Sequence, residues 1–123
     1  MGVHNYIYLG RERGKRVVHK VGQTTQTCWA RCKNSDYLIG VGVDIIFPLG
    51  TRFPESKLNL IEWEMLNYFS NLFNIEHGRE YFRTKGYYWE DTKKLFLDKL
   101  ISILDREGFK YTIYEGWVEP FSY

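Results

Sequence analysis

A small set of side chains that could do chemistry lies between residues 8 and 64. Tyr8 and Lys20 belong to two short runs, Tyr-Ile-Tyr and Lys-Val-Gly, and lie 12 residues apart. That spacing is consistent with two paired strands and a short loop. Arg31 follows on the next expected helix, and a carboxylate, Glu62 or Glu64, lies in a later apolar-faced helix. A phenol, two cations and a carboxylate are groups that can bind an anion and move a proton.

Other familiar chemistries are missing from the sequence. Cys28 and Cys32 provide only half of a tetrahedral zinc site, and His4, His19 and His77 are scattered without ligand spacing. The chain has no nucleophile elbow, no P-loop and no dinucleotide-binding fingerprint. Free cysteines inside the fold therefore explain the two thiols better than a metal centre does.

The charge is distributed unevenly along the chain. The whole sequence carries 17 basic and 15 acidic residues, a net charge of +2, but the segment that ends at Lys33 holds seven bases and one acid, Glu12. This excess of +6 is typical of a surface that faces phosphate groups. A solvated hairpin loop explains it equally well. Two bases of this segment, Lys20 and Arg31, already belong to the group of possible catalytic side chains. The other five are our candidates for nucleic-acid binding: Arg11, Arg13, Lys15, Arg16 and Lys33.

Three strands and three helices are expected to position these residues. Alternating β-branched and aromatic residues predict strands over about 5–10, 16–22 and 41–48. A threonine-rich cap predicts a short helix over 28–34. Apolar residues at helical spacing predict two longer helices, over about 56–73 and 91–107, the second ended by Gly108. Extended pieces over 80–83 and 111–114 complete an α+β fold, a three-stranded antiparallel sheet flanked by helices.

Length and composition bound the rest. The 123 residues fit one compact domain, and no stretch approaches a membrane span or a secretory signal. Two cysteines cannot form the disulfide scaffold of a small secreted protein. We therefore expect a single cytoplasmic domain that does not enter a membrane.

This arrangement resembles the GIY-YIG nuclease family. Tyr6-Ile7-Tyr8 stands where the GIY triplet would be and Lys20-Val21-Gly22 where YIG would be, while Arg31 and Glu62 match the helical arginine and glutamate. The segment 78–82, Gly-Arg-Glu-Tyr-Phe, looks like an element of a phage-associated subgroup. The resemblance covers residues 5–83 as the core and leaves 84–123 as a C-terminal helical extension.

The resemblance implies an endonuclease that hydrolyses DNA phosphodiester bonds with one metal ion, Mg²⁺ or Mn²⁺. Tyr8 would orient or deprotonate the attacking water, and Lys20 would lower the pKa of the phenol, which is about 10 when unperturbed. Arg31 would grip the phosphate, and Glu62 would bind the metal. The catalytic set is then Tyr8, Lys20, Arg31 and Glu62.

Three departures keep a second interpretation open. Tyr6 replaces the first glycine of GIY, Lys20 replaces the first tyrosine of YIG, and Ser35 replaces a common histidine or tyrosine. The tyrosine is counted among the catalytic residues of the family. The alternative is therefore a catalytically inactive module of the same fold that binds nucleic acid or protein, in a phage- or defence-related role.

Helix geometry favours Glu62 over Glu64 as the metal ligand. Glu62 shares a face with Leu58, Met65 and Phe69, and a carboxylate among apolar neighbours needs a cation or strong donors to stay charged. Glu64 shares a more mixed surface. A structural ion pair between Glu62 and a base remains the alternative.

The helix over 91–107 carries more apolar residues than one stripe needs. Part of that surplus can be buried against another copy, which makes a homodimer a candidate assembly. The residues concerned are Leu95, Phe96, Leu97, Leu100, Ile101, Ile103 and Leu104.

Overall fold

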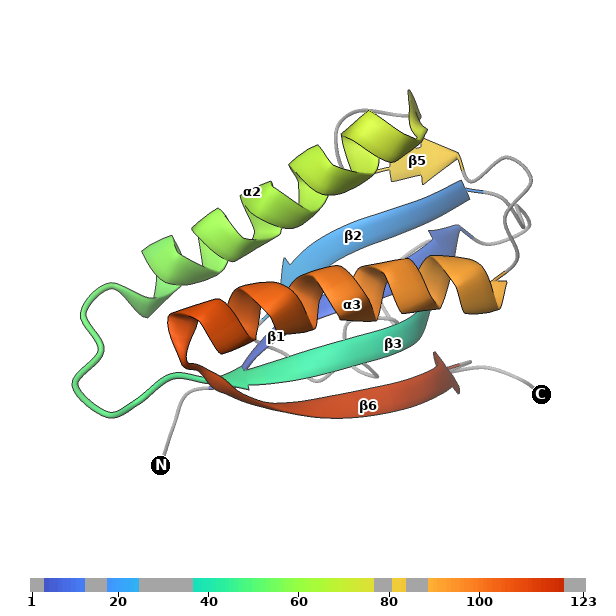
Figure 1. The fold of residues 1–123 in the computed structure, drawn as a ribbon. Helices are drawn as coiled ribbons and strands as arrows, with labels where there is room; N and C mark the ends of the chain where they lie inside the picture. The colour runs from blue at the N-terminus through green and yellow to red at the C-terminus, as the bar shows by residue number, and fades with distance from the viewer. Residues whose placement is uncertain (1–3, 13–17, 25–36, 77–80, 84–88, 119–123) are drawn as a thin grey trace.

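The computed structural model describes residues 4–12, 18–24, 37–76, 81–83 and 89–118. Six strands and two helices lie in this part of the chain (Figure 1). In chain order they are β1 (His4–Glu12), β2 (Val18–Thr24), β3 (Tyr37–Ile46), α2 (Pro54–Leu72), β4 (Asn74–Glu76), β5 (Tyr81–Arg83), α3 (Trp89–Glu107) and β6 (Lys110–Val118). The expected helix over 28–34 lies outside the described residues.

The strands form one antiparallel sheet in the order β4-β5-β2-β1-β3-β6. The α+β class, the pairing of the first two strands and the extended pieces expected over 80–83 and 111–114 are confirmed, although the sheet has six strands rather than three. The sheet is wider because β6 pairs with β3 over most of its length and β5 extends the other side beside β2. The C-terminal extension thus contributes a strand as well as a helix to the same fold.

Both described helices cover one face of this sheet (Figure 1). Aliphatic residues of β1, β2 and β3, among them Ile7, Leu9 and Val21, are fully buried against α2 and α3. The helical side of this core includes Met65 and Phe96, both 0% exposed. The layers join because each element presents one apolar face and must bury it.

The ends of the helices follow from local chemistry. Pro54 occupies the first turn of α2, where its missing N–H leaves no intrahelical bond unmade. Gly108 has φ +74° and directly follows α3, as the sequence predicts. Phe109 then donates its backbone N–H to the Leu104 carbonyl at 3.0 Å, and the chain turns into β6.

Six of the seven apolar residues expected to exceed one stripe of α3 pack within the fold. Phe96, Leu100, Ile103 and Leu104 are buried, and Leu95 and Leu97 pack partly buried against the same core. No described helix is long and apolar enough to cross a membrane.

Candidate functional site

The β1–β2 hairpin brings Tyr8 and Lys20 to the same face of the sheet. Tyr8 lies opposite Gly22 and Gly10 lies opposite Lys20, so Lys20 is the diagonal neighbour of Tyr8. Diagonal neighbours have Cβ atoms about 7–8 Å apart, within reach of long side chains. Because side chains alternate along a strand, both point away from the face that packs on α2 and α3. Two of the four predicted catalytic residues therefore lie together.

Gly22 provides the space for the Tyr8 ring. A Cβ placed on Gly22 would overlap the Tyr8 hydroxyl and Cζ, and would lie 3.1 Å from Cε1. The ring therefore leans across β2 rather than standing over its own strand. The hydroxyl is held above a position that only glycine leaves open.

The Tyr8 hydroxyl lies close to the part of β2 that extends beyond its pairing with β5. β5 pairs with β2 only from Val18 to Lys20. Among the described residues, Val21 to Thr24 have no strand partner on the side of β2 away from β1. Gly22 and the Tyr8 side chain are nevertheless both buried.

The face that carries Tyr8 is polar and yet buried. Tyr8 is 1% exposed and Lys20 8%. Asp44, 2% exposed, lies opposite Tyr6 in the β1–β3 pairing and so shares this face. Burying charged groups costs free energy unless they are paired, and Lys20 and Asp44 both have interactions within the protein. Asp44 is not among the residues predicted from the sequence, although an acid inside the apolar run Val-Gly-Val-Asp-Ile-Ile is a detectable signal.

Glu62 reaches the same level of the sheet from the helical layer. α2 runs antiparallel to β2 (Figure 1), and Gln23 donates its Nε2–H to Asn59 Oδ1 at 2.6 Å. One turn of helix advances about 5 Å, close to one and a half residues of a strand. Glu62 is therefore level with Val21 and Gly22, on the opposite side of the sheet from the Tyr8 ring. It is half-buried and engaged in a polar interaction.

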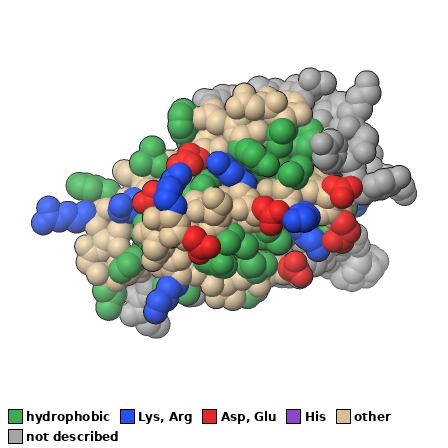
Figure 2. Space-filling model, viewed as in Figure 1, with side chains coloured by type: hydrophobic (Ala, Val, Ile, Leu, Met, Phe, Trp, Pro, Cys, Tyr) green, Lys and Arg blue, Asp and Glu red, His purple; other side chains and the backbone are tan. Residues whose placement is uncertain are grey.

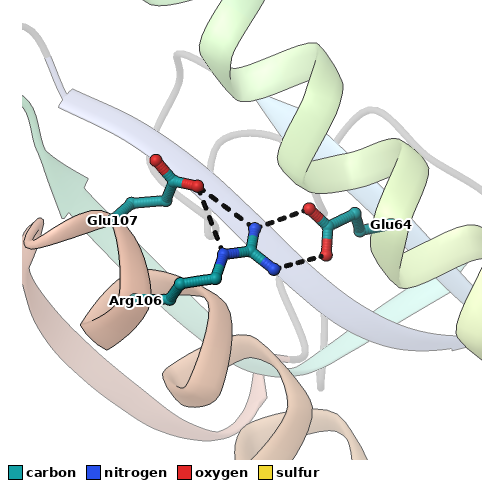
Figure 3. Close-up of polar contacts among 3 residues, drawn as sticks. All are labelled: Glu64, Arg106 and Glu107. Atoms are coloured by element: carbon teal, nitrogen blue, oxygen red, sulfur yellow. Dashed lines mark hydrogen bonds and ion pairs between the residues drawn. The ribbon is translucent and has the colours of Figure 1, made fainter.

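Glu64 is occupied by a different partner (Figure 3). Arg106 of α3 donates two hydrogen bonds to the Glu64 carboxylate, at 2.6 and 3.3 Å. The same guanidinium contacts Glu107 Oε1 at 3.2 Å. The hydrogen bond from Arg106 lowers the pKa of Glu64 below its usual value, and burial opposes this shift. Glu64 thus links α2 to α3.

Of the remaining predicted residues, Arg11 lies on the other face of the sheet from Tyr8 and Lys20, and the others lie outside the described residues. Arg11 lies opposite His19, on the face that packs against the helices, and His19 stacks on Trp89 with ring centroids 5.9 Å apart. Arg31 and the candidate phosphate-binding residues Arg13, Lys15, Arg16 and Lys33 lie outside the described residues.

The donor set suits a hard divalent cation that keeps most of its waters. In the described part of the chain, no three His, Cys, Asp or Glu side chains gather into a metal cluster. Mg²⁺ can be held by one carboxylate, several waters and a substrate phosphate. Glu62 would be the single carboxylate of such a site, and it also has a polar interaction within the protein.

Comparisons with protein-family models, with curated proteins and with solved structures find no match to this chain.

Proposed function

We propose that this protein is a metal-dependent endonuclease that hydrolyses DNA phosphodiester bonds. The observation that carries the proposal is the Tyr8 hydroxyl held over Gly22, with Lys20 beside it. Phosphodiester hydrolysis uses groups of these kinds: a phenol and an ammonium, here on one face of the sheet, and a carboxylate, here level with them in the helical layer. The resemblance of the two triplets to GIY and YIG agrees with this assignment.

In the proposed reaction, Tyr8 accepts a proton from the attacking water through its phenolate oxygen. Lys20 stabilises the phenolate and holds a phosphate oxygen as a point charge. Arg31 binds a second phosphate oxygen. The water oxygen forms the new bond to phosphorus, the bond between phosphorus and a deoxyribose oxygen breaks, and that oxygen leaves with a proton from solvent. Mg²⁺ or Mn²⁺ held by Glu62 would supply positive charge beside the leaving oxygen.

A plasmid-nicking assay tests the proposal. We expect the wild-type protein to nick supercoiled DNA with Mg²⁺ or Mn²⁺, and Glu62→Gln to lose that activity while keeping its fold. Glu64→Gln is the matched control, since it removes a carboxylate two residues away that pairs with Arg106. Absence of nicking by folded wild-type protein under both metals would refute the proposal. If Glu62→Gln still nicks DNA while Glu64→Gln does not, the assignment of Glu62 as the metal ligand is wrong.

The low exposure of the Tyr8 face favours a second candidate function. With Tyr8 at 1% and Lys20 at 8% exposure, little of either side chain is offered to a phosphate. A binding module of the same fold, without cleavage, would need neither group at the surface. It predicts DNA affinity that falls steeply with salt, through the basic N-terminal third, and no metal-dependent cutting. In either function the proposed partner is DNA and the proposed location is the cytoplasm.

A further inference from the structure

A side-chain hydrogen bond joins α2 to the neighbouring strand β2, one helical turn before Glu62. Gln23 donates from Nε2 to Asn59 Oδ1 at 2.6 Å, and the two residues lie 36 positions apart in the sequence. Asn59 is exposed and Gln23 is half-buried, so the bond lies at the surface of the molecule. A hydrogen bond between neutral groups at the surface adds little to stability, because water would satisfy both of them. Its main effect is to fix the direction in which the Asn59 amide points.

This hydrogen bond turns the donor end of the Asn59 amide away from Gln23. Because Oδ1 accepts from Gln23, the Nδ2 amino group with its two N–H donors lies on the other branch of the amide. Asparagine and glutamine amides are among the groups that proteins use to bind phosphate oxygens. Such an amide carries no charge, so it contributes through its position rather than through attraction at a distance.

Asn59 and Glu62 share one flank of α2. Residues three apart on a helix are neighbours on its surface, with Cβ atoms about 5–6 Å apart. Asn59 contacts β2, whereas Glu64 lies on the other flank of the helix and pairs with Arg106 of α3. A divalent cation on Glu62 would bind one oxygen of a DNA phosphate, and a second oxygen of that phosphate would accept a hydrogen bond from Asn59 Nδ2.

The charges on this flank make the cation necessary. Glu55 lies one turn before Asn59 on the same flank, so the amide is bordered by the carboxylates of Glu55 and Glu62. Over the described residues of the helical side, basic and acidic side chains are interspersed rather than gathered into one basic patch (Figure 2). Without a cation, these carboxylates would repel a phosphate. A phosphate would therefore bind to the amide only together with the metal.

We propose that Asn59 is a phosphate-binding residue of the candidate site, oriented by Gln23 and acting beside a cation held by Glu62. This inference rests on the proposed function, because it needs both DNA and the metal on Glu62. Asn59 then contributes to the affinity for DNA and takes no part in proton transfer.

Gln23→Leu and Asn59→Leu form a matched pair of variants that tests the proposal. Both remove the same hydrogen bond, so a purely structural role predicts equal effects of the two variants. Only Asn59→Leu also removes the outward N–H donor. Binding of a short fluorescein-labelled DNA duplex is measured by fluorescence anisotropy, with Ca²⁺ as the hard divalent cation and again in EDTA. Nicking with Mg²⁺ is measured separately.

We expect Asn59→Leu to raise the dissociation constant for DNA in Ca²⁺ by at least about tenfold, since a hydrogen bond to a charged group is among the stronger ones. Gln23→Leu should raise it only about two- to threefold, because the amide remains but is no longer oriented. In EDTA both variants should bind DNA as the wild type does. In nicking, Asn59→Leu should raise KM and leave kcat nearly unchanged.

Equal effects of the two variants on DNA binding would overturn the proposal, as would a loss in Asn59→Leu that is the same in EDTA as in Ca²⁺. Metal-dependent binding that is weakened by Asn59→Leu, in a protein that never nicks DNA, would refute the nuclease function and support the phosphate site. Nicking with an unchanged KM in Asn59→Leu would refute the phosphate site and support the nuclease. A wild-type protein that neither binds nor nicks DNA would refute both.

Discussion

The two faces of β1 and β2 are both buried but differ in composition. Ile7, Leu9 and Val21 point toward the helices and are 0% exposed in an aliphatic core. Tyr8 and Lys20, one residue out of step, are buried on the opposite face with polar groups. Burial of apolar side chains stabilises a fold. Burial of an ammonium group costs free energy unless hydrogen bonds or an opposite charge in the protein replace the water it has lost. Alternation along a strand therefore separates the aliphatic core residues from the residues of the candidate site.

Leu9→Ala should give the largest effect on stability. Leu9 is fully buried in the helical core, and removing its side chain leaves a cavity there. We expect the free energy of unfolding to fall by about 2–5 kcal/mol in a urea titration. Nicking activity per folded molecule should stay close to that of the wild type, since the side chain points away from Tyr8. A variant that stays stable but loses activity would break the comparison between the two faces.

Tyr8→Phe should show the converse effect. The substitution keeps the ring over Gly22 and removes only the hydroxyl. We expect nicking to slow by about 100-fold, the usual effect of losing an acid–base group. The free energy of unfolding should change by less than about 1.5 kcal/mol, the net value of a hydrogen bond. If the folded Tyr8→Phe variant nicks DNA as fast as the wild type, the Tyr8 hydroxyl has no role in the reaction.

Gly22→Ala should combine smaller effects of both kinds. Its Cβ would meet the Tyr8 hydroxyl and Cζ, so the ring must move. We expect a loss of about 1–2 kcal/mol in stability, typical of an overpacked site. Nicking should fall about tenfold because a displaced catalytic group reacts slowly.

Gly50→Ala is the control for this effect. Gly50 has no heavy atom within 4 Å of an added Cβ, but its φ of +84° makes alanine costly there. A loss of about 1 kcal/mol is expected from backbone strain alone. The two variants would then lose similar stability, and only Gly22→Ala should lose activity. Equal activity in both would show that the position of the Tyr8 ring does not matter.

The sequence predicts the local elements better than their assembly. The helix expected over 56–73 spans Pro54–Leu72, and the one expected over 91–107 spans Trp89–Glu107. These boundaries follow from apolar periodicity and from Gly108. β4 has only three residues, too few for a period, and β6 joins β3 through pairing that depends on the folded chain.

The sequence likewise predicts some features of the candidate site and not others. Strand alternation and hairpin spacing are enough to put Tyr8 and Lys20 on one face. The lean of the Tyr8 ring over Gly22 depends on packing that spacing does not encode. Likewise, the Glu64–Arg106 pair joins residues 42 positions apart and exists only because α2 and α3 cross. Helix geometry alone distinguishes Glu62 from Glu64, but it does not reveal this partner.

Glu64→Gln should give the smallest effect, and that effect should depend on pH. Hydrogen bonding to Arg106 lowers the pKa of Glu64 in the folded protein below the reference value of 4.5. The ion pair therefore stabilises the fold at pH values above 4.5, and its contribution is lost as the pH falls through the lowered pKa. Because the pair is partly exposed, we expect only about 2 °C between wild type and variant at pH 7. Calorimetry from pH 7 to pH 2 should show the two melting temperatures converge in acid, and 1 M salt should reduce the difference at pH 7.

The double variant Glu64→Gln/Arg106→Met should lose little more stability than either single variant, since the same interaction is removed in all three. If the difference in melting temperature persists unchanged in acid, Glu64 stabilises the fold through packing rather than charge. Its ion pair with Arg106 would then no longer distinguish Glu64 from Glu62, and only their positions on α2 would.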